Sequence, residues 1–439
     1  MSDPRRFAHA LVDLLFDHVE SIESRPVVEW MPHDALRQMV RIDGALSDPI
    51  DLARMVARYA NQLHHPSYLG HQVCPPFLEA AATDLLISVL NNSNAVSEMS
   101  PIGTAIEKEI VRWLADRAGY PETSEGTAVS GGSAANLTGL LAARARWSRE
   151  NPGRRPRIIT SADAHYSIAR AAAIMGIPAT DVLKVPTDAR HRMDVDVLDE
   201  LLQTQEPVMA IVATSGSTAT GAFDPLVDIV ALRDRYRTWL HVDAAHGASV
   251  LLSNRLSHLV NGLAHADSFS WDPHKMMWMP LSLGTILVRD GLWLRRAFEA
   301  DAPYLFHADR AGENIGEITI QCSKRSDPIK LWLMLKSQGV KPFADTIERV
   351  TDLTRYLYER VVASDDFEAV HEPELNIFCF RKRGLDSAQT DALREQLKRS
   401  GEAWLTTTVL NGERVLRVTM MNPRTTERHI DAMLDSLRG

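Results

Sequence analysis

The feature that most constrains the fold is a regular alternation of short apolar runs and helical patterns between Thr127 and Asp290. The apolar runs are TAVS, RIIT, VMAIVAT, TWLHVDAA, SFSW and GTILVRD. The segments with helical periodicity are SAANLTGLLAARARW, HYSIARAAAIMG and PLVDIVALRDRYR. Because strand-then-helix repetition builds a largely parallel sheet covered by helices, we expect a large α/β domain here.

Two further parts flank this region. The chain has 439 residues, more than one compact core usually serves. Its beginning reads as mostly helical, whereas its end alternates apolar runs (NIFCFR, AWLTTTVL, RVLRVTM) with helices, which suggests a small antiparallel sheet. We therefore expect an N-terminal helical segment at 1–75, a large domain at 76–335 and a small C-terminal α/β domain at 336–439.

Composition excludes several classes of function. A formal net charge of -9 lacks the basic surplus that nucleic-acid binding needs. The three cysteines form no CxxC pair, which argues against a disulfide framework or a structural zinc site. The N-terminal helix is interrupted by Asp13, Asp17 and Glu20, unlike a signal peptide, and no apolar run is long enough to span a membrane. We expect a soluble, cytoplasmic enzyme.

The stretch SFSWDPHKMM, Ser268–Met277, contains the first candidate for chemistry. Its lysine, Lys275, is followed by Met276, Met277 and Trp278. Burial disfavours an ammonium group, so a lysine in a semi-apolar pocket loses its proton more easily than one in water. Lys275 is therefore a candidate Schiff-base nucleophile.

Three other features lie along the same region. Asp243 ends the apolar run TWLHV, where a carboxylate would emerge at the carboxyl edge of a sheet. The Gly-Gly-Ser turn before SAANL could hold a phosphate on the N–H groups of Gly132, Ser133 and Ala134. His165 follows another apolar run. Each has a plain structural alternative: a turn aspartate, a simple connecting turn and a structural histidine.

Together these four features match the needs of one cofactor. Pyridoxal phosphate requires a phosphate anchor, a flat ring to stack on, an anion beside its pyridine nitrogen and an amine that binds its aldehyde. The chain supplies them in that order as Ser133, His165, Asp243 and Lys275. It has neither the GxGxxG pattern of nicotinamide enzymes nor a Walker A sequence.

The motifs SGGSAANL, DAHYS, HVDAAHG and DSFSWDPHKMM resemble those of the group II pyridoxal-phosphate-dependent amino-acid decarboxylases. This family includes glutamate, cysteine-sulfinate and aromatic-amino-acid decarboxylases. Segments such as HPSYLGHQ, GAFDPL and TIQCSKRSDPIKLW follow in family order, so the resemblance covers nearly the whole chain. It implies the fold-type I architecture, which is aspartate aminotransferase-like, with a seven-stranded mainly parallel sheet and a small C-terminal domain.

The resemblance also implies roles for particular residues. Lys275 would be the Schiff-base lysine and Asp243 the partner of the pyridinium nitrogen, while His165 would stack on the cofactor. The other residues implied at the cofactor are Ser133, Ala134, Thr214, Ala245, Asp272 and His274. Asp272 stands where some relatives carry asparagine, which leaves its part in phosphate binding open.

Substrate contacts are implied in the flanking parts of the chain. Arg417 matches the arginine that meets the substrate carboxylate, and a guanidinium suits that partner. Tyr68, His71 and Gln72 would lie near the substrate side chain, or else pack at a subunit boundary. The family implies a homodimer with active sites at the subunit interface. It favours acidic or aromatic L-amino acids as substrates, giving the amine and CO2, and leaves diamino substrates open.

One segment departs from the family pattern. Relatives carry a loop tyrosine that protonates the substrate carbon after CO2 has left, but Leu305–Gln321 contains none. His307, Tyr68 and His274 are then candidate proton donors. The alternative is oxygen-dependent formation of an aldehyde, or another reaction of the same cofactor.

Overall fold

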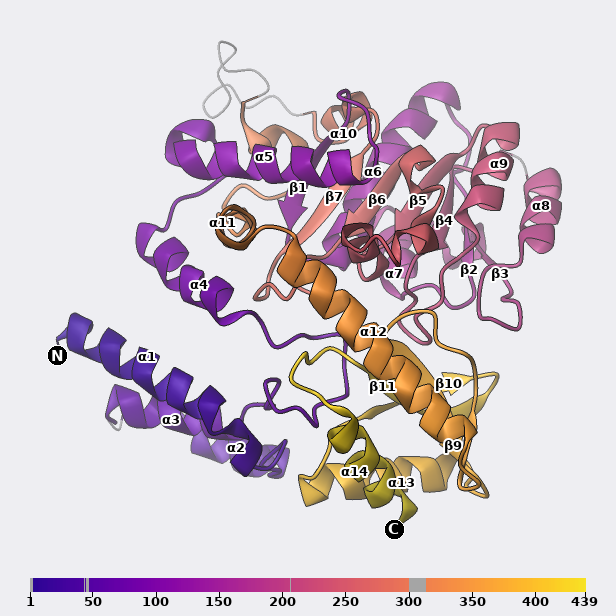
Figure 1. Ribbon diagram of the computed structural model, residues 1–439. Coiled ribbons are helices and arrows are strands. Elements are labelled where there is room, and N and C mark those ends of the chain that lie inside the picture. Colours follow the sequence, from indigo (N-terminus) through magenta and orange to yellow (C-terminus); the bar gives the residue numbers. More distant parts are fainter. Residues whose placement is uncertain (1–2, 43, 45–46, 206, 300–312) are drawn as a thin grey trace. The chain divides into compact units, whose positions relative to one another are not determined.

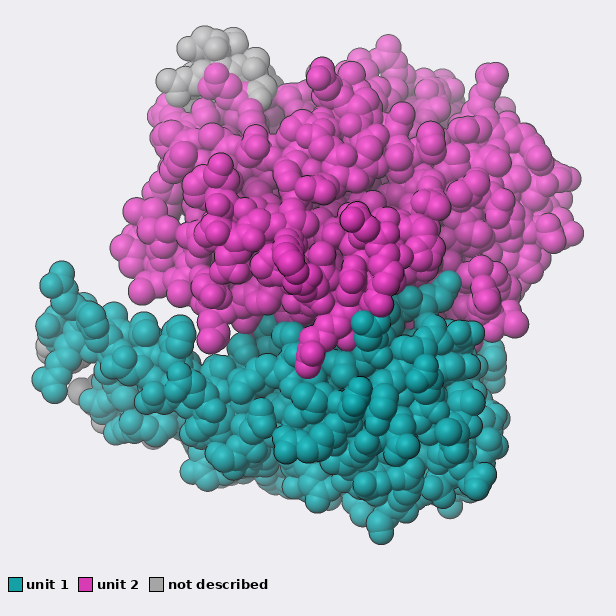
Figure 2. Space-filling model, in the orientation of Figure 1, with its two compact units in different colours: residues 1–75, 350–439 teal, residues 76–349 magenta. Residues whose placement is uncertain are grey.

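The computed structural model describes residues 3–42, 44, 47–205, 207–299 and 313–439. The chain forms two compact units, one of residues 76–349 and the other of residues 1–75 together with 350–439 (Figure 2). The N-terminal residues expected to form a separate segment thus share a unit with the C-terminal residues. The boundary expected at 335/336 falls inside helix α11 (Pro328–Gln338).

The unit of residues 76–349 is built on a seven-stranded sheet in the order β1-β7-β6-β5-β4-β2-β3 (Figure 1). Strand β7 pairs antiparallel with both of its neighbours, whereas β6, β5, β4, β2 and β3 pair in parallel. The mainly parallel sheet expected from the sequence is confirmed. The strands are β1 (Glu125–Val129), β2 (Ile158–Ser161), β3 (Val182–Val185), β4 (Ala210–Thr214), β5 (Trp239–Asp243), β6 (Ser268–Trp271) and β7 (Gly284–Val288).

Helix α6 (Gly132–Glu150) packs against the centre of this sheet, in contact with β5, β6 and β7. Small residues permit the close approach: a Cβ added to Gly139 would lie 2.7 Å from Nδ1 of His241 on β5. The other helices of the unit are α4 (Leu78–Leu90), α5 (Pro101–Arg117), α7 (Ser167–Ile174), α8 (Val195–Thr204), α9 (Leu226–Tyr236), α10 (Gly291–Ala297) and α11, and α12 (Lys341–Val362) begins here.

The unit of residues 1–75 and 350–439 contains a four-stranded antiparallel sheet in the order β10-β11-β9-β8. Leu69 explains why the N-terminal residues belong to it, since its N–H donates to the carbonyl of Trp404 at 2.7 Å and its own carbonyl accepts from Thr419 at 3.0 Å. The elements are α1 (Pro4–Glu20), α2 (His33–Met39), α3 (Pro49–Tyr59), β8 (Phe367–Ala369), β9 (Ile377–Lys382), α13 (Ser387–Ser400), β10 (Thr406–Leu410), β11 (Glu413–Thr419) and α14 (Glu427–Arg438).

Among the helices of the described residues, none has both the length and the apolar character needed to cross a bilayer.

Candidate active site

Four of the candidate residues lie at or just beyond the carboxyl ends of parallel strands in the larger unit. Thr214 ends β4 and Asp243 ends β5, and the two are register partners. His165 follows β2 (Ile158–Ser161), and Lys275 follows β6 (Ser268–Trp271). Because these strands run in the same direction, all four residues lie at one edge of the sheet, where open α/β sheets bind ligands.

The carboxylate of Asp243 is held by three donors. Asn136 Nδ2 donates to Oδ2 at 2.8 Å, Ser270 Oγ donates to Oδ1 at 3.1 Å, and the N–H of Ala245 lies 3.3 Å from Oδ1. The residue is only 7% exposed. Its orientation is therefore fixed by both β6 and α6, which suits a fixed negative charge at a cofactor ring nitrogen.

His165 is half-buried at the same edge, and its Nδ1 lies 2.8 Å from Ser167 Oγ. Burial lowers the pKa of His165, with Asp243 acting in the opposite direction. Its imidazole is therefore neutral near pH 7, and a neutral flat ring can stack on a cofactor.

Lys275 lies in a more polar setting than its sequence neighbours suggested. Met276, Met277 and Trp278 are fully buried in the core, whereas the Lys275 side chain is 22% exposed and its Nζ lies 3.3 Å from Asp272 Oδ2. The amine thus has a carboxylate partner and access to solvent. Burial lowers the pKa of the adjacent His274, whose Nδ1 lies 2.8 Å from the carbonyl oxygen of Leu283.

The Gly-Gly-Ser turn begins α6 and differs in detail from the expectation. The N–H of Gly132 donates to Asp272 Oδ2 at 2.9 Å, and that of Ala134 donates to the Gly131 carbonyl at 2.9 Å. Ser133 is exposed, and within the described residues neither its N–H nor its hydroxyl has a hydrogen-bond partner. Ser133, at the positive end of the helix, is thus the part of the turn available to a phosphate.

The residues at this edge fit pyridoxal phosphate. Thr214 Oγ1 is buried and has no hydrogen-bond partner among the described residues, so a polar group of a ligand could satisfy it. A Cβ added to Gly132 would lie 2.9 Å from that of Ala245, so the turn approaches Ala245 as closely as a glycine allows. An amine, a carboxylate, an imidazole and an open helix end are the donor set that this cofactor needs.

Asp224 was not identified from the sequence as a residue that shapes the site. Its Oδ2 accepts the N–H of Thr214 at 2.7 Å, and its Oδ1 accepts the N–H of Met193 at 2.7 Å. Burial raises the pKa of Asp224 to about 6. The signal was the motif GAFDPL, in which an aspartate interrupts an apolar run.

Asn136, Ser167 and Ser270 were also missed. Asn136 is a buried amide on the sheet-facing side of α6, Ser167 begins α7, and Ser270 lies in β6. A polar residue on an otherwise apolar helix face, as in SAANLTGLL, was the available signal for Asn136.

The residues expected near the substrate belong to the smaller unit. Arg417 on β11 is 5% exposed and donates from Nη1 to Thr406 Oγ1 at 3.3 Å; burial lowers the pKa of its guanidinium. Tyr68 stacks on Trp404 with ring centroids 6.0 Å apart. Partial burial, followed by the charges of Arg417 and Arg394, lowers the pKa of His71. Gln72 Nε2 is buried without a partner among the described residues.

Part of the departure from the family pattern falls outside the described residues. His307 and the first half of Leu305–Gln321 lie in residues 300–312, which the structure does not describe. In the sequence, Tyr304 comes immediately before Leu305–Gln321, and it also lies outside the described residues.

The chain is similar in sequence to pyridoxal-dependent decarboxylases. The family model described as "Pyridoxal-dependent decarboxylase conserved domain" matches residues 50–383. An aromatic-L-amino-acid decarboxylase of Bacillus atrophaeus is 30% identical over 442 residues, covering 96% of this chain and 92% of that protein. A cysteine sulfinic acid decarboxylase of Rattus norvegicus is 34% identical over 376 residues, covering 81% and 76%.

The crystal structure of mouse CSAD superimposes with a TM-score of 0.91 at 29% sequence identity, covering 100% of this chain and 99% of that one. This likeness confirms the fold class expected from the sequence.

Proposed function

Since the chain belongs to the pyridoxal-dependent decarboxylase family, and is therefore a lyase that decarboxylates an amino acid with pyridoxal phosphate, we propose that its substrate has an acidic or aromatic side chain and that Lys275 carries the cofactor. The observation that carries this proposal is the meeting of Lys275, Asp243, Thr214 and His165 at one edge of the sheet.

Each residue has a proposed part in holding the cofactor. Ser133 would bind the phosphate with its N–H and hydroxyl, and Asp243 would face the ring nitrogen. His165 and Ala245 would lie against the two faces of the ring, and the hydroxyl of Thr214 would donate to a polar group of the cofactor or to His165. Asp272 would hold the Lys275 amine, because its Oδ2 lies 3.3 Å from Nζ, and His274 would lie close to the cofactor and substrate.

When bound, pyridoxal phosphate supplies a conjugated ring that accepts the electron pair released as the carboxylate leaves as CO2. Asp243 is proposed to keep a proton on the ring nitrogen, since three donors hold its carboxylate in one position. Tyr68 and His274 remain the described candidates for returning a proton to Cα, and His307 lies outside the described residues.

Arg417 is the proposed contact of the substrate carboxylate, because a buried guanidinium binds an anion strongly. Two observations in its unit bear on the side chain. The positive charges of Arg417 and Arg394 both lower the pKa of His71. Positive charge in this part of the chain favours a substrate with an acidic side chain. The stacked rings of Tyr68 and Trp404 favour an aromatic one.

A homodimer is proposed as the active form. Helix α4 exposes Leu85, Leu86, Val89 and Leu90, and α1 exposes Val12, Leu15 and Phe16. Exposed apolar rows of this kind mark interfaces, and a second copy of the chain is the proposed occupant. Sedimentation equilibrium tests this, with a monomer at micromolar concentration as the refuting result. The three cysteines, which form no CxxC pair, support a cytoplasmic location, and cell fractionation tests it.

The test of function is a panel of L-amino acids added to the cofactor-loaded protein: aspartate, glutamate, cysteine sulfinate, tryptophan and 3,4-dihydroxyphenylalanine. CO2, amine, aldehyde, ammonia and dissolved oxygen are followed together. Amine and CO2 in equal amounts without oxygen uptake, from an acidic or aromatic substrate, support the proposal. Oxygen uptake with formation of an aldehyde would refute the proposal. The relatives that are named decarboxylases do not favour that alternative.

The same assay with Tyr304→Phe would show whether this tyrosine, next to the segment that departs from the family pattern, affects the product.

A further inference from the structure

A single amide lies at the junction between the two proposed cofactor contacts, Asp243 and His165. Asn136 Nδ2 lies 2.8 Å from Asp243 Oδ2 and 3.0 Å from Ser167 Oγ. Ser167 Oγ in turn lies 2.8 Å from His165 Nδ1. The carboxylate and the imidazole are therefore joined through two buried side chains, Asn136 and Ser167, that the sequence did not single out.

The chemistry of the partners fixes the direction of each hydrogen bond. A carboxylate only accepts, so Asp243 must face the NH2 group of Asn136 and not its oxygen. The second N–H of that group then donates to Ser167 Oγ, which leaves the Ser167 hydroxyl hydrogen for His165 Nδ1. The backbone N–H of Ser167 lies 3.3 Å from His165 Nδ1, and it too can act only as a donor. His165 Nδ1 is thus an acceptor, and its proton lies on Nε2.

The oxygen of Asn136 faces a second histidine. Asn136 Oδ1 lies 3.0 Å from His241 Nε2, which must therefore carry a hydrogen. Burial lowers the pKa of His241 to about 4, so the ring is neutral and its Nδ1 accepts. The donor to that nitrogen is Ser268 Oγ at 2.8 Å.

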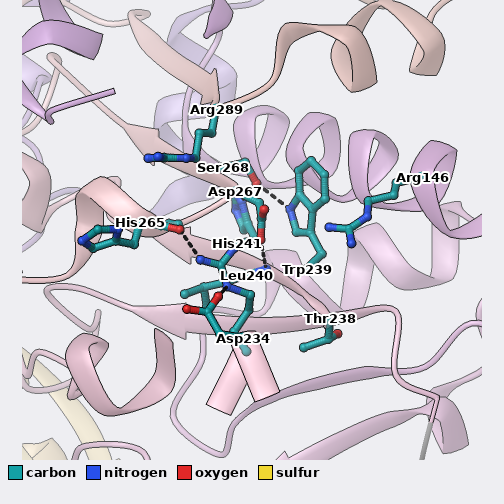
Figure 3. Close-up of polar contacts among 12 residues, drawn as sticks. Arg146, Asp234, Thr238, Trp239, Leu240, His241, His265, Asp267, Ser268 and Arg289 are labelled. Carbon is teal, nitrogen blue, oxygen red and sulfur yellow. Dashed lines mark hydrogen bonds and ion pairs between the residues drawn. The ribbon is translucent and has the colours of Figure 1, made fainter. Parts of the chain in front are cut away.

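The network ends at a donor that cannot reverse. Trp239 Nε1 donates to Ser268 Oγ at 2.9 Å, and an indole N–H has no acceptor role. Figure 3 shows Trp239 and Ser268 joined by this bond with His241 beside them. The order of donation from Trp239 through Ser268, His241 and Asn136 to Asp243 is then the same at every step.

We propose that Asn136, oriented by His241, is a positioning residue that aims the carboxylate of Asp243 at the cofactor ring nitrogen and holds the proton of His165 on Nε2. A reversed amide would set its oxygen against the Asp243 carboxylate and its NH2 group against the N–H of His241. Both contacts would be repulsive, so a defect at His241 reaches the cofactor through Asn136. This inference rests on the proposed role of Asp243.

The test compares the affinity for pyridoxal phosphate with that for its 1-deaza analogue, which lacks the ring nitrogen, by absorbance titration of the cofactor-free protein. Wild type should bind pyridoxal phosphate more tightly, because only this ligand has the atom that Asp243 faces. Asn136→Asp keeps the shape but replaces the donor by an acceptor, and should reduce the preference at least tenfold. Absence of any preference in wild type would instead refute the proposed role of Asp243 itself.

Asn94→Asp is the matched control. Asn94 is equally buried in the same unit, but its amide donates to Gly103 and Glu107, outside this network. It should keep the wild-type preference whatever it does to thermal stability. An unchanged preference in Asn136→Asp would overturn the proposal and leave Asn136 with a structural role only.

A second pair of variants covers the case in which Asn136→Asp does not fold. Glutamine can place an N–H where His241 has Nε2–H, whereas phenylalanine cannot. In His241→Gln the preference for pyridoxal phosphate over the 1-deaza analogue should stay within threefold of wild type. In His241→Phe this preference should fall at least tenfold. The same ligand preference in His241→Gln and His241→Phe would overturn the proposal. Nitrogen-15 spectra of histidine-labelled wild type, assigned with His241→Gln, should show His241 protonated on Nε2, and protonation on Nδ1 would also overturn it.

Discussion

His241 should make the folding stability of this protein depend on pH in a defined window. The imidazole is fully buried, and burial lowers its pKa from 6.5 to about 4. A group whose folded-state pKa lies below its unfolded value contributes stability that is fully present above pH 6.5 and is lost as the pH falls through 4. The unfolded chain binds a proton at His241 in this window, and the folded chain does not.

The size of the effect follows from the shift. A difference of 2.5 pH units between 6.5 and about 4, at 1.36 kcal/mol per unit, gives roughly 3 kcal/mol. His241→Gln removes the titrating group and costs about 1 kcal/mol at pH 7 for the lost bond from Ser268. Below pH 6 the variant should catch up with wild type, and near pH 4 it should be more stable by about 2 kcal/mol.

Urea unfolding of the cofactor-free protein at pH 7, 6, 5 and 4 measures this difference. Other histidines titrate in both proteins and cancel in the comparison. His258→Gln, which removes an exposed histidine of the same unit, is the control for the loss of one imidazole. Parallel curves for His241→Gln and wild type would refute the assignment of His241 as a buried neutral ring.

Three further outcomes are expected. Lys275→Ala should lose the visible absorbance band of bound cofactor that borohydride reduces, together with more than 99% of turnover, whereas Asp243→Ala should keep some bound cofactor and lose turnover at least a hundredfold. Thr214→Val should leave the urea midpoint of the cofactor-free protein unchanged, because Oγ1 has no partner in the described residues, yet weaken cofactor binding several-fold in an absorbance titration. Lys324→Met should cost about 3–5 kcal/mol of unfolding free energy in urea, since it leaves the buried carboxylate of Glu107 without its ion-pair partner, and adding Glu107→Gln should recover part of that loss.

The sheet and the main site residues could be predicted because their signals are local. An apolar run followed by a helical pattern identifies a strand, and the residue at the end of that run must lie at the carboxyl edge. Asp243 was found in this way, whereas Thr214 was implied by the family resemblance, and the structure makes the two register partners. Asp272 also lies close in sequence to Lys275, but its contact with Nζ depends on the turn after β6 and has no periodic signal.

The contacts that escaped prediction join residues far apart in the chain. Asn136 meets Asp243 across 107 positions and His241 across 105. Leu69 pairs with Trp404 and Thr419, which is why residues 1–75 belong with the C-terminal sheet and not to a unit of their own. Neither relationship leaves a mark in local composition, because hydrogen bonding depends on where the folded backbone places the two partners.

The cofactor contact and the core of the larger unit depend on the same packing. His241 and Asp243 are two residues apart on β5, so both side chains point to the face that α6 covers. Asn136 and Gly139 are three apart on α6, so the amide and the gap left by the glycine lie side by side, and that gap accommodates the His241 ring. The amide can reach Asp243 only while α6 lies this close to β5. A change that moves the helix away from the strand must therefore disturb the proposed ring-nitrogen contact even where no ligand-facing residue is altered.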